Sequence, residues 1–98
     1  MDKAYVIQTL RRHEGELRAA GILHLRLFGS LSRGQASHDS DIDLLAEFEK
    51  SRRMSLVSVG HIQMRLSELL GAPVDLSSAE WMREPIRSAA LSEAILAF

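Results

Sequence analysis

The sequence predicts an α/β (α+β) fold in which helices pack on one small mixed sheet, in the order α-β-(turn)-β-α-β-α. Two observations predict it. Apolar residues recur at helical spacing near the start and in the middle of the chain. Between these stretches, apolar and polar residues alternate in short runs that are typical of strands. The length of 98 residues suits one small domain, so we expect a single domain over residues 1–98.

Three helices are expected. The first covers residues 2–20, because apolar side chains repeat every three or four positions, Asp2 suits the N-cap and Gly21 suits the C-terminal end. The second covers residues 55–70 for the same reason, and a glycine follows it too. The third covers residues 85–98, since its first residue is a proline, which suits a first helical turn.

Three strands are expected between these helices. Leucines alternate with other residues over 23–28, and a second strand covers 41–48. Turn-forming residues fill 31–40, which predicts a short helical turn followed by a loop. A brief third strand covers 73–76, and residues 77–80 resemble a capping box that starts another short turn.

Composition excludes several classes of function. The chain has 12 Lys and Arg against 13 Asp and Glu, a formal charge of −1, so we expect no bulk binding to nucleic acid. It has no cysteine, which excludes disulfides and thiolate chemistry. No apolar run approaches the roughly 20 residues of a membrane span, and the N-terminal sequence lacks the features of a signal peptide. We therefore expect a cytoplasmic protein with no membrane partner.

The second expected strand carries two candidate metal ligands, Asp41 and Asp43. Residues two apart on a strand project from the same face, with attachment points about 6.6–6.8 Å apart. Ile42 and Leu44 then face the core and hold the pair on a rigid element. Oxygen ligands without His or Cys favour Mg²⁺ or Mn²⁺. The pair alone is equally compatible with two acidic side chains on a solvent-facing strand.

Three further candidates lie near that pair or repeat its chemistry. Gly29 and Ser30 end a strand where a helical turn begins, which suits polyphosphate, and Arg33 follows one turn later. By themselves these residues also fit a simple turn. Asp75 lies between two apolar residues of the brief strand, so it would join the acidic pair if the two strands are neighbours; a turn-capping aspartate is the alternative. Three converging carboxylates suit two-metal phosphoryl or nucleotidyl transfer.

The segment GSLSRGQASHDSDIDLL, residues 29–45, resembles the signature of the nucleotidyltransferase superfamily with a polymerase-beta-like core. The ten residues between Ser30 and Asp41 resemble the minimal nucleotidyltransferases most closely. PVDL at 73–76 matches the place of that family's third carboxylate, and REPIR at 83–87 resembles the start of its C-terminal helix. The resemblance covers most of the chain.

Members of that minimal group are antitoxins encoded beside HEPN-domain RNase toxins. The resemblance implies that this chain binds ATP with two Mg²⁺ ions (Mn²⁺ is possible) and transfers AMP to a tyrosine of such a toxin. It also implies roles by position. Gly29 and Ser30 would hold the β- and γ-phosphates, and Arg33 aligns with a common family arginine. Asp41 and Asp43 would ligate both metals, and Asp75 would ligate one of them and help to deprotonate the attacking hydroxyl.

Two other classes of function stay open at this point. One is an antitoxin that neutralises its toxin by binding alone, and the other is a nucleotidyltransferase that acts on a small molecule or an RNA end. Candidate contact surfaces are a basic pair, Arg52 and Arg53, and the aromatic Trp81, each of which also fits an ordinary surface or core-edge role. The apolar tail 89–98 is expected to pack partly on a partner.

Overall fold

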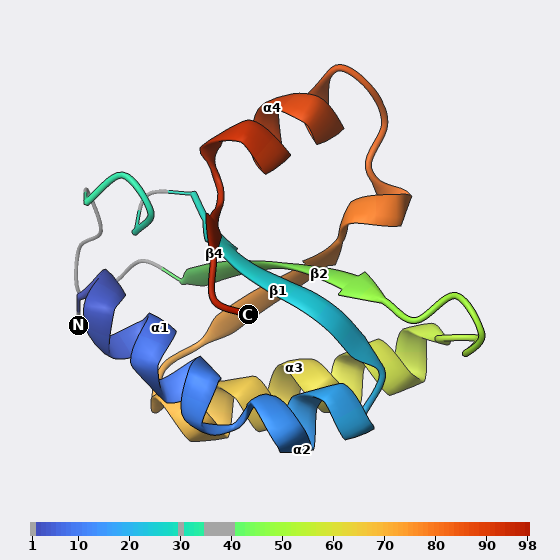
Figure 1. The fold of residues 1–98 in the computed structure, drawn as a ribbon, viewed down its shortest axis with the longest axis horizontal. Helices are drawn as coiled ribbons and strands as arrows, with labels where there is room; N and C mark the ends of the chain where they lie inside the picture. Colours follow the sequence, from blue (N-terminus) through green and yellow to red (C-terminus); the bar gives the residue numbers. More distant parts are fainter. Residues whose placement is uncertain (1, 30, 35–40) are drawn as a thin grey trace.

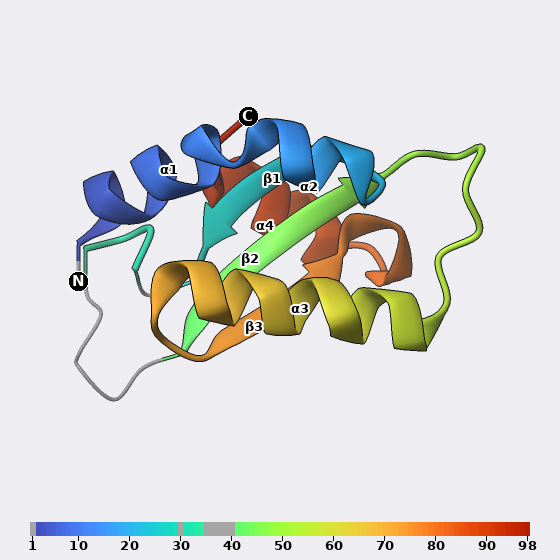
Figure 2. The same cartoon turned by 90° about the horizontal axis from the view of Figure 1, so that it is seen from below.

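A four-stranded sheet in the order β3-β2-β1-β4 forms the centre of the molecule in this computed structural model. The structure describes all residues except 1, 30 and 35–40. Helices α1, α2 and α3 cover one face of the sheet, and α4 lies on the opposite side (Figures 1 and 2). The elements are α1 (Lys3–Arg12), α2 (Glu14–Ala19), β1 (Ile22–Phe28), β2 (Ile42–Phe48), α3 (Leu56–Leu70), β3 (Val74–Ser78), the short 3₁₀ helix η1 (Ala79–Trp81), α4 (Ile86–Glu93) and β4 (Ile95–Leu96).

The sheet is mixed. β1 pairs antiparallel with β2 and with β4, whereas β2 and β3 run parallel. The parallel pair is joined by α3, as a crossover connection requires. This arrangement confirms the predicted α/β fold class. No helix in the described part of the chain is long and apolar enough to cross a membrane.

The N-terminal segment forms two helices, so the prediction of one continuous helix over residues 2–20 was wrong. The break is at His13, whose backbone leaves the helical region at φ −105° and ψ 16°. Its Nδ1 lies 2.9 Å from the carbonyl of Thr9, and its amide donates to the carbonyl of Leu10. This turn separates α1 from α2. The predicted N-cap is confirmed, since Asp2 accepts a 2.8 Å bond from the amide of Tyr5.

The C-terminal segment also differs from the prediction. The helix begins at Ile86 and ends at Glu93; the backbone becomes extended at Ala94 and forms β4, so the helix does not reach Phe98. The physical reason is the free edge of β1. The amide of Ala97 donates a 2.8 Å bond to the carbonyl of Leu25, and the amide of Leu25 donates a 3.2 Å bond to the carbonyl of Phe98.

The predicted capping box at residues 77–80 is not formed. β3 extends to Ser78, and η1 has no side-chain cap. By contrast, α3 matches its prediction closely. Ser55 accepts a 3.0 Å bond from the amide of Ser58, and Gly71 ends the helix in the left-handed conformation.

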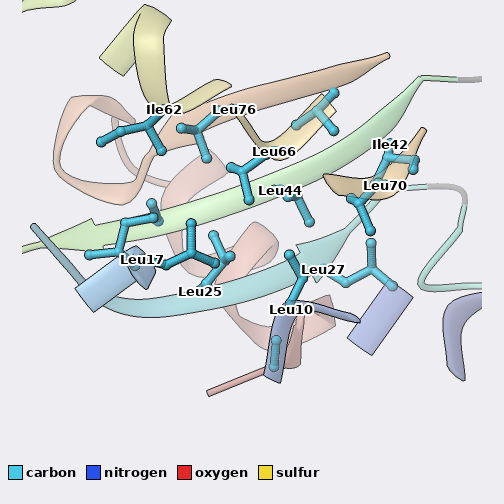
Figure 3. Close-up of a cluster of buried hydrophobic side chains, with 14 of the residues drawn as sticks. Leu10, Leu17, Leu25, Leu27, Ile42, Leu44, Ile62, Leu66, Leu70 and Leu76 are labelled. Atoms are coloured by element: carbon cyan, nitrogen blue, oxygen red, sulfur yellow. The ribbon is translucent and has the colours of Figure 1, made fainter. Parts of the chain in front are cut away.

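Leucine side chains from three helices and three strands form the core beneath the sheet. Leu10 and Leu17 pack from α1 and α2, Leu25 and Leu44 from the central strands, and Leu66 from α3 (Figure 3). All five are at most 1% exposed, and burying each contributes roughly 1.5–3 kcal/mol. This core fixes β1, β2 and β3 beside one another, and the residues on the opposite face of these strands form the candidate site.

Candidate active site

Two carboxylates face each other across neighbouring strands. Asp43 of β2 and Asp75 of β3 are partners in the parallel register, and neighbouring strands lie about 4.8 Å apart. Asp41 directly precedes β2, which begins one residue later than predicted. Next to these aspartates, Ile42 and Leu44 are buried in the core, so the acidic side chains project from the other face of the sheet. The fold therefore brings together all three predicted acidic residues.

Burial and electrostatic repulsion both raise the pKa of Asp43. Burial raises the pKa of Asp43 above its ordinary value, and the negative charges of Asp75 and then Asp41 raise it further. The cation of Arg33 opposes this by lowering the same pKa. The site thus concentrates negative charge at a half-buried position, and a bound cation is the usual remedy for such repulsion.

Gly29 gives Asp43 the space it occupies. Its backbone is left-handed, with φ +76°, at the end of β1. A Cβ built there would lie 3.1 Å from both Cβ and Cγ of Asp43 and well inside 3.0 Å of its Oδ2. Sequence analysis predicted that this glycine admits a ligand, but did not predict its contact with Asp43. The closest neighbour of Gly29 is thus the carboxylate itself.

A turn follows Gly29 and carries Arg33. The hydroxyl of Ser32 donates a 2.7 Å bond to the carbonyl of Gly29, and the amide of Gly34 donates to the carbonyl of Leu31, which closes the turn. Ser30 lies outside the described residues, so its predicted contact with phosphate stays a prediction. Ser32 was not a predicted site residue, although a serine that bonds the carbonyl three residues before it is a common local motif.

Arg33 connects this turn to α4, which lies on the same side of the sheet as the aspartates. Its Nη1 lies 3.4 Å from Oε2 of Glu93 at the end of α4, and its charge reaches Asp43. Glu93 was not a predicted site residue, because 60 residues separate it from Arg33 and no local pattern links the two. Both side chains are about half exposed, so the contact orients Arg33 more than it stabilises the fold.

The donor set fits a hard divalent cation. Asp41, Asp43 and Asp75 offer only oxygen ligands, and their mutual repulsion disfavours the cation-free state. In the described part of the chain, no three His, Asp or Glu side chains already stand in a metal-binding arrangement. The chemistry of the donor set therefore agrees with Mg²⁺ or Mn²⁺, and the roles of these residues stay predictions.

Comparison with known proteins gives a consistent result. Residues 10–97 match the nucleotidyltransferase domain family. The protein adenylyltransferase MntA of Thermococcus cleftensis is 36% identical over 87 residues, which cover 88% of this chain and 86% of that protein. A solved structure provisionally described as a minimal nucleotidyltransferase is 38% identical, with a TM-score of 0.75 and coverage of 97% of this chain and 95% of the other.

More distant structures share the fold. A toxin–antitoxin structure with AMP-PNP contains a chain with a TM-score of 0.72 at 18% identity, which covers 100% of this chain and 73% of that one. A complex of a tri-AMPylated HEPN toxin from Shewanella oneidensis with an MNT antitoxin gives a TM-score of 0.67 at 17% identity, with coverage of 94% and 71%. The family match and the 36% identical relative show that the chain belongs to the nucleotidyltransferase domain family, and the 38% identical structure places it among the minimal nucleotidyltransferases.

Proposed function

We propose that this chain is an antitoxin that transfers AMP from ATP to a tyrosine of a HEPN-domain RNase toxin. The observation that carries the proposal is the pairing of Asp43 with Asp75 across β2 and β3, next to Gly29. The name of the MntA relative supports protein adenylylation, and the HEPN complex of a fold relative supports the class of partner.

In the proposed reaction, the tyrosine oxygen attacks the α-phosphorus of ATP. A new O–P bond forms, the bond between the α-phosphorus and the bridging oxygen breaks, and pyrophosphate leaves. Asp75 accepts the phenolic proton and passes it to water. Asp75 is exposed to solvent, so the tyrosine of a protein acceptor can reach its carboxylate. Gly29 and the turn after it face the phosphates, and Arg33 contributes positive charge beside them.

Asp41, Asp43 and Asp75 are proposed to hold two Mg²⁺ ions. When bound, these ions neutralise charge on the attacking and leaving oxygens. The chain's own contribution is a rigid pair of strands that fixes the three carboxylates before substrate arrives.

The test measures the transfer of label from α-labelled ATP to a HEPN toxin encoded beside this chain, with Mg²⁺ present. Asp43→Asn should reduce labelling by roughly a hundredfold or more, the scale of losing one electrostatic partner in a transition state. Glu68→Gln is the matched control, because it removes an exposed carboxylate of α3 outside the site. No labelling by the wild type, or equal labelling by Asp43→Asn, would contradict the proposal.

Two outcomes point to the alternatives. If a variant with all three aspartates changed to asparagine still protects cells from the toxin, neutralisation is by binding alone. If labelled RNA forms and labelled toxin does not, the acceptor is an RNA end.

A further inference from the structure

A pocket lies at the end of β2 away from the aspartate site. It has a volume of about 360 Å³ and lies between η1 and the connection that follows β2. Phe48, which lines this pocket, lies five positions after Asp43 along β2, which corresponds to about 16 Å of strand. The volume falls within the range of small-ligand sites, so the pocket can take a ligand independently of the aspartate site.

An aromatic ring stands at the edge of the pocket. Trp81 is 52% exposed, and it is the only tryptophan of the chain. Phe48 and Met54 line the pocket beside it. An indole held by a 3₁₀ turn and partly open to solvent offers a flat face on which a planar ring can stack.

Three cationic side chains line the pocket together with that ring. Lys50 and Arg87 line the pocket, and among the described residues neither side chain has a hydrogen-bond or ion-pair partner. Arg52 also lines it and donates a 2.7 Å bond to the carbonyl of Ala19, which leaves its other guanidinium donors for a ligand. Cationic groups beside an aromatic face suit a ligand that combines a ring with a phosphate.

Two carboxylates narrow the class of ligand further. Glu49 and Glu80 line the same pocket, so the three cations exceed the acids by one charge. The two carboxylates would repel a bare phosphate or sulfate ion. A nucleotide carries hydroxyl and amine donors as well as phosphate, and can therefore satisfy both signs of charge.

We propose that this pocket binds a nucleoside monophosphate unit. Its base stacks on Trp81, its phosphate lies between Lys50 and Arg87, and its ribose hydroxyls or exocyclic amine donate to Glu49 and Glu80. The unit is either a free mononucleotide or one nucleotide of a single-stranded RNA. This site is separate from the aspartate site and does not depend on the function proposed for it.

The single tryptophan makes the test direct. Titration with AMP should quench the fluorescence of Trp81 saturably, with excitation at the red edge of indole absorption, where adenine does not absorb. Adenosine should bind roughly tenfold or more weakly, since it lacks the phosphate. Lys50→Gln with Arg87→Gln should weaken AMP binding to a similar extent. Arg83→Gln is the matched control, because it removes an exposed cation one helical turn before Arg87 that does not line the pocket.

Each further comparison decides one point. Asp41→Asn with Asp43→Asn should leave the quenching unchanged, which separates this pocket from the aspartate site. A short oligoadenylate that binds more tightly than AMP identifies RNA as the source, and equal or weaker binding identifies the free nucleotide. No saturable quenching by either probe, or equal affinity in the Lys50/Arg87 and Arg83 variants with unchanged circular dichroism, would overturn the proposal.

Discussion

Gly29 and Asp43 share a space that only a glycine leaves open. The positive φ of Gly29 disfavours any side chain there, and the Asp43 carboxylate occupies the volume that a Cβ would need. Burial and then the negative charges of Asp75 and Asp41 raise the pKa of this same carboxyl. The position of one acidic oxygen therefore depends on the absence of one methyl group.

Gly29→Ala should destabilise the protein by more than the roughly 1–2 kcal/mol of a left-handed alanine and should also reduce AMP transfer. Gly34→Ala is the matched control, since Gly34 has a similar φ of +71° but nothing within 4 Å of the position that a Cβ would take. Urea unfolding and the labelling assay compare the two. Equal effects of both substitutions would show that the clash with Asp43 is unimportant.

At the scale of elements, α2 and α3 are joined by an ion pair on their solvent side. Nε and Nη2 of Arg65 lie 2.6 and 3.0 Å from the two carboxylate oxygens of Glu16. This hydrogen bond with Arg65 lowers the pKa of Glu16 below its ordinary value of 4.5. Two donors on one carboxylate fix the relative rotation of the helices that cover the core.

Glu16→Gln should remove part of the pH dependence of stability. The pKa of Glu16 is lower in the folded protein than in the unfolded chain. Its contribution to the free energy of unfolding is therefore fully present above pH 4.5 and is lost as pH falls through the lowered pKa. The urea midpoints of variant and wild type should therefore differ at neutral pH and converge in acid. Glu68→Gln, whose contact with Arg65 is longer at 3.5 Å, should have a smaller effect. A difference that persists in acid would contradict this assignment.

Helix α4 buries less of its surface against the rest of the protein than helix α3 does. None of its residues is buried, whereas α3 buries Val59, Ile62, Leu66 and Leu70. We therefore expect the amides of α4 to exchange with solvent much faster than those of the middle of α3, because local opening exposes little apolar surface. Hydrogen exchange on the whole chain measures this, and equal protection of both helices would contradict it.

At the scale of the whole molecule, the last two residues join the helical layer to the sheet. Phe98 is 8% exposed, and the guanidinium carbon of Arg18 lies 5.1 Å from its ring centre. Nε of Arg11 donates a 2.7 Å bond to the carbonyl of Ala97. The chain end therefore contacts α1, α2 and β1 together, and its packing belongs to the same cooperative unit as the core.

Phe98→Ala should destabilise the whole domain by about 3 kcal/mol or more, the usual cost of deleting a buried phenyl ring. Trp81 fluorescence and far-ultraviolet circular dichroism should still report one unfolding transition. Leu96→Ala is the matched control, because Leu96 is 46% exposed in the same segment and should cost much less. Two separate transitions would show that the chain end folds independently.

Local sequence patterns were enough to establish the fold class, α3 with the glycine that ends it, and the alternation of acidic with apolar residues on β2. Those features depend on local spacing, since periods of 3.6 and 2 assign each side chain to a face. Local patterns also placed Asp43 and Asp75 on strands before any neighbour was known, whereas Asp41 directly precedes β2. They did not predict the break at His13, which the turn geometry around Thr9 and Leu10 produces.

The remaining features arise from packing between distant segments. The helix predicted to reach Phe98 ends at Glu93, and the residues after it form backbone hydrogen bonds with the free edge of β1 as β4. The Arg33–Glu93 contact and the fit of Gly29 to Asp43 join segments far apart in the chain. Spacing along a sequence fixes which way a side chain points, and only the pairing of strands and the packing of helices fix what it meets.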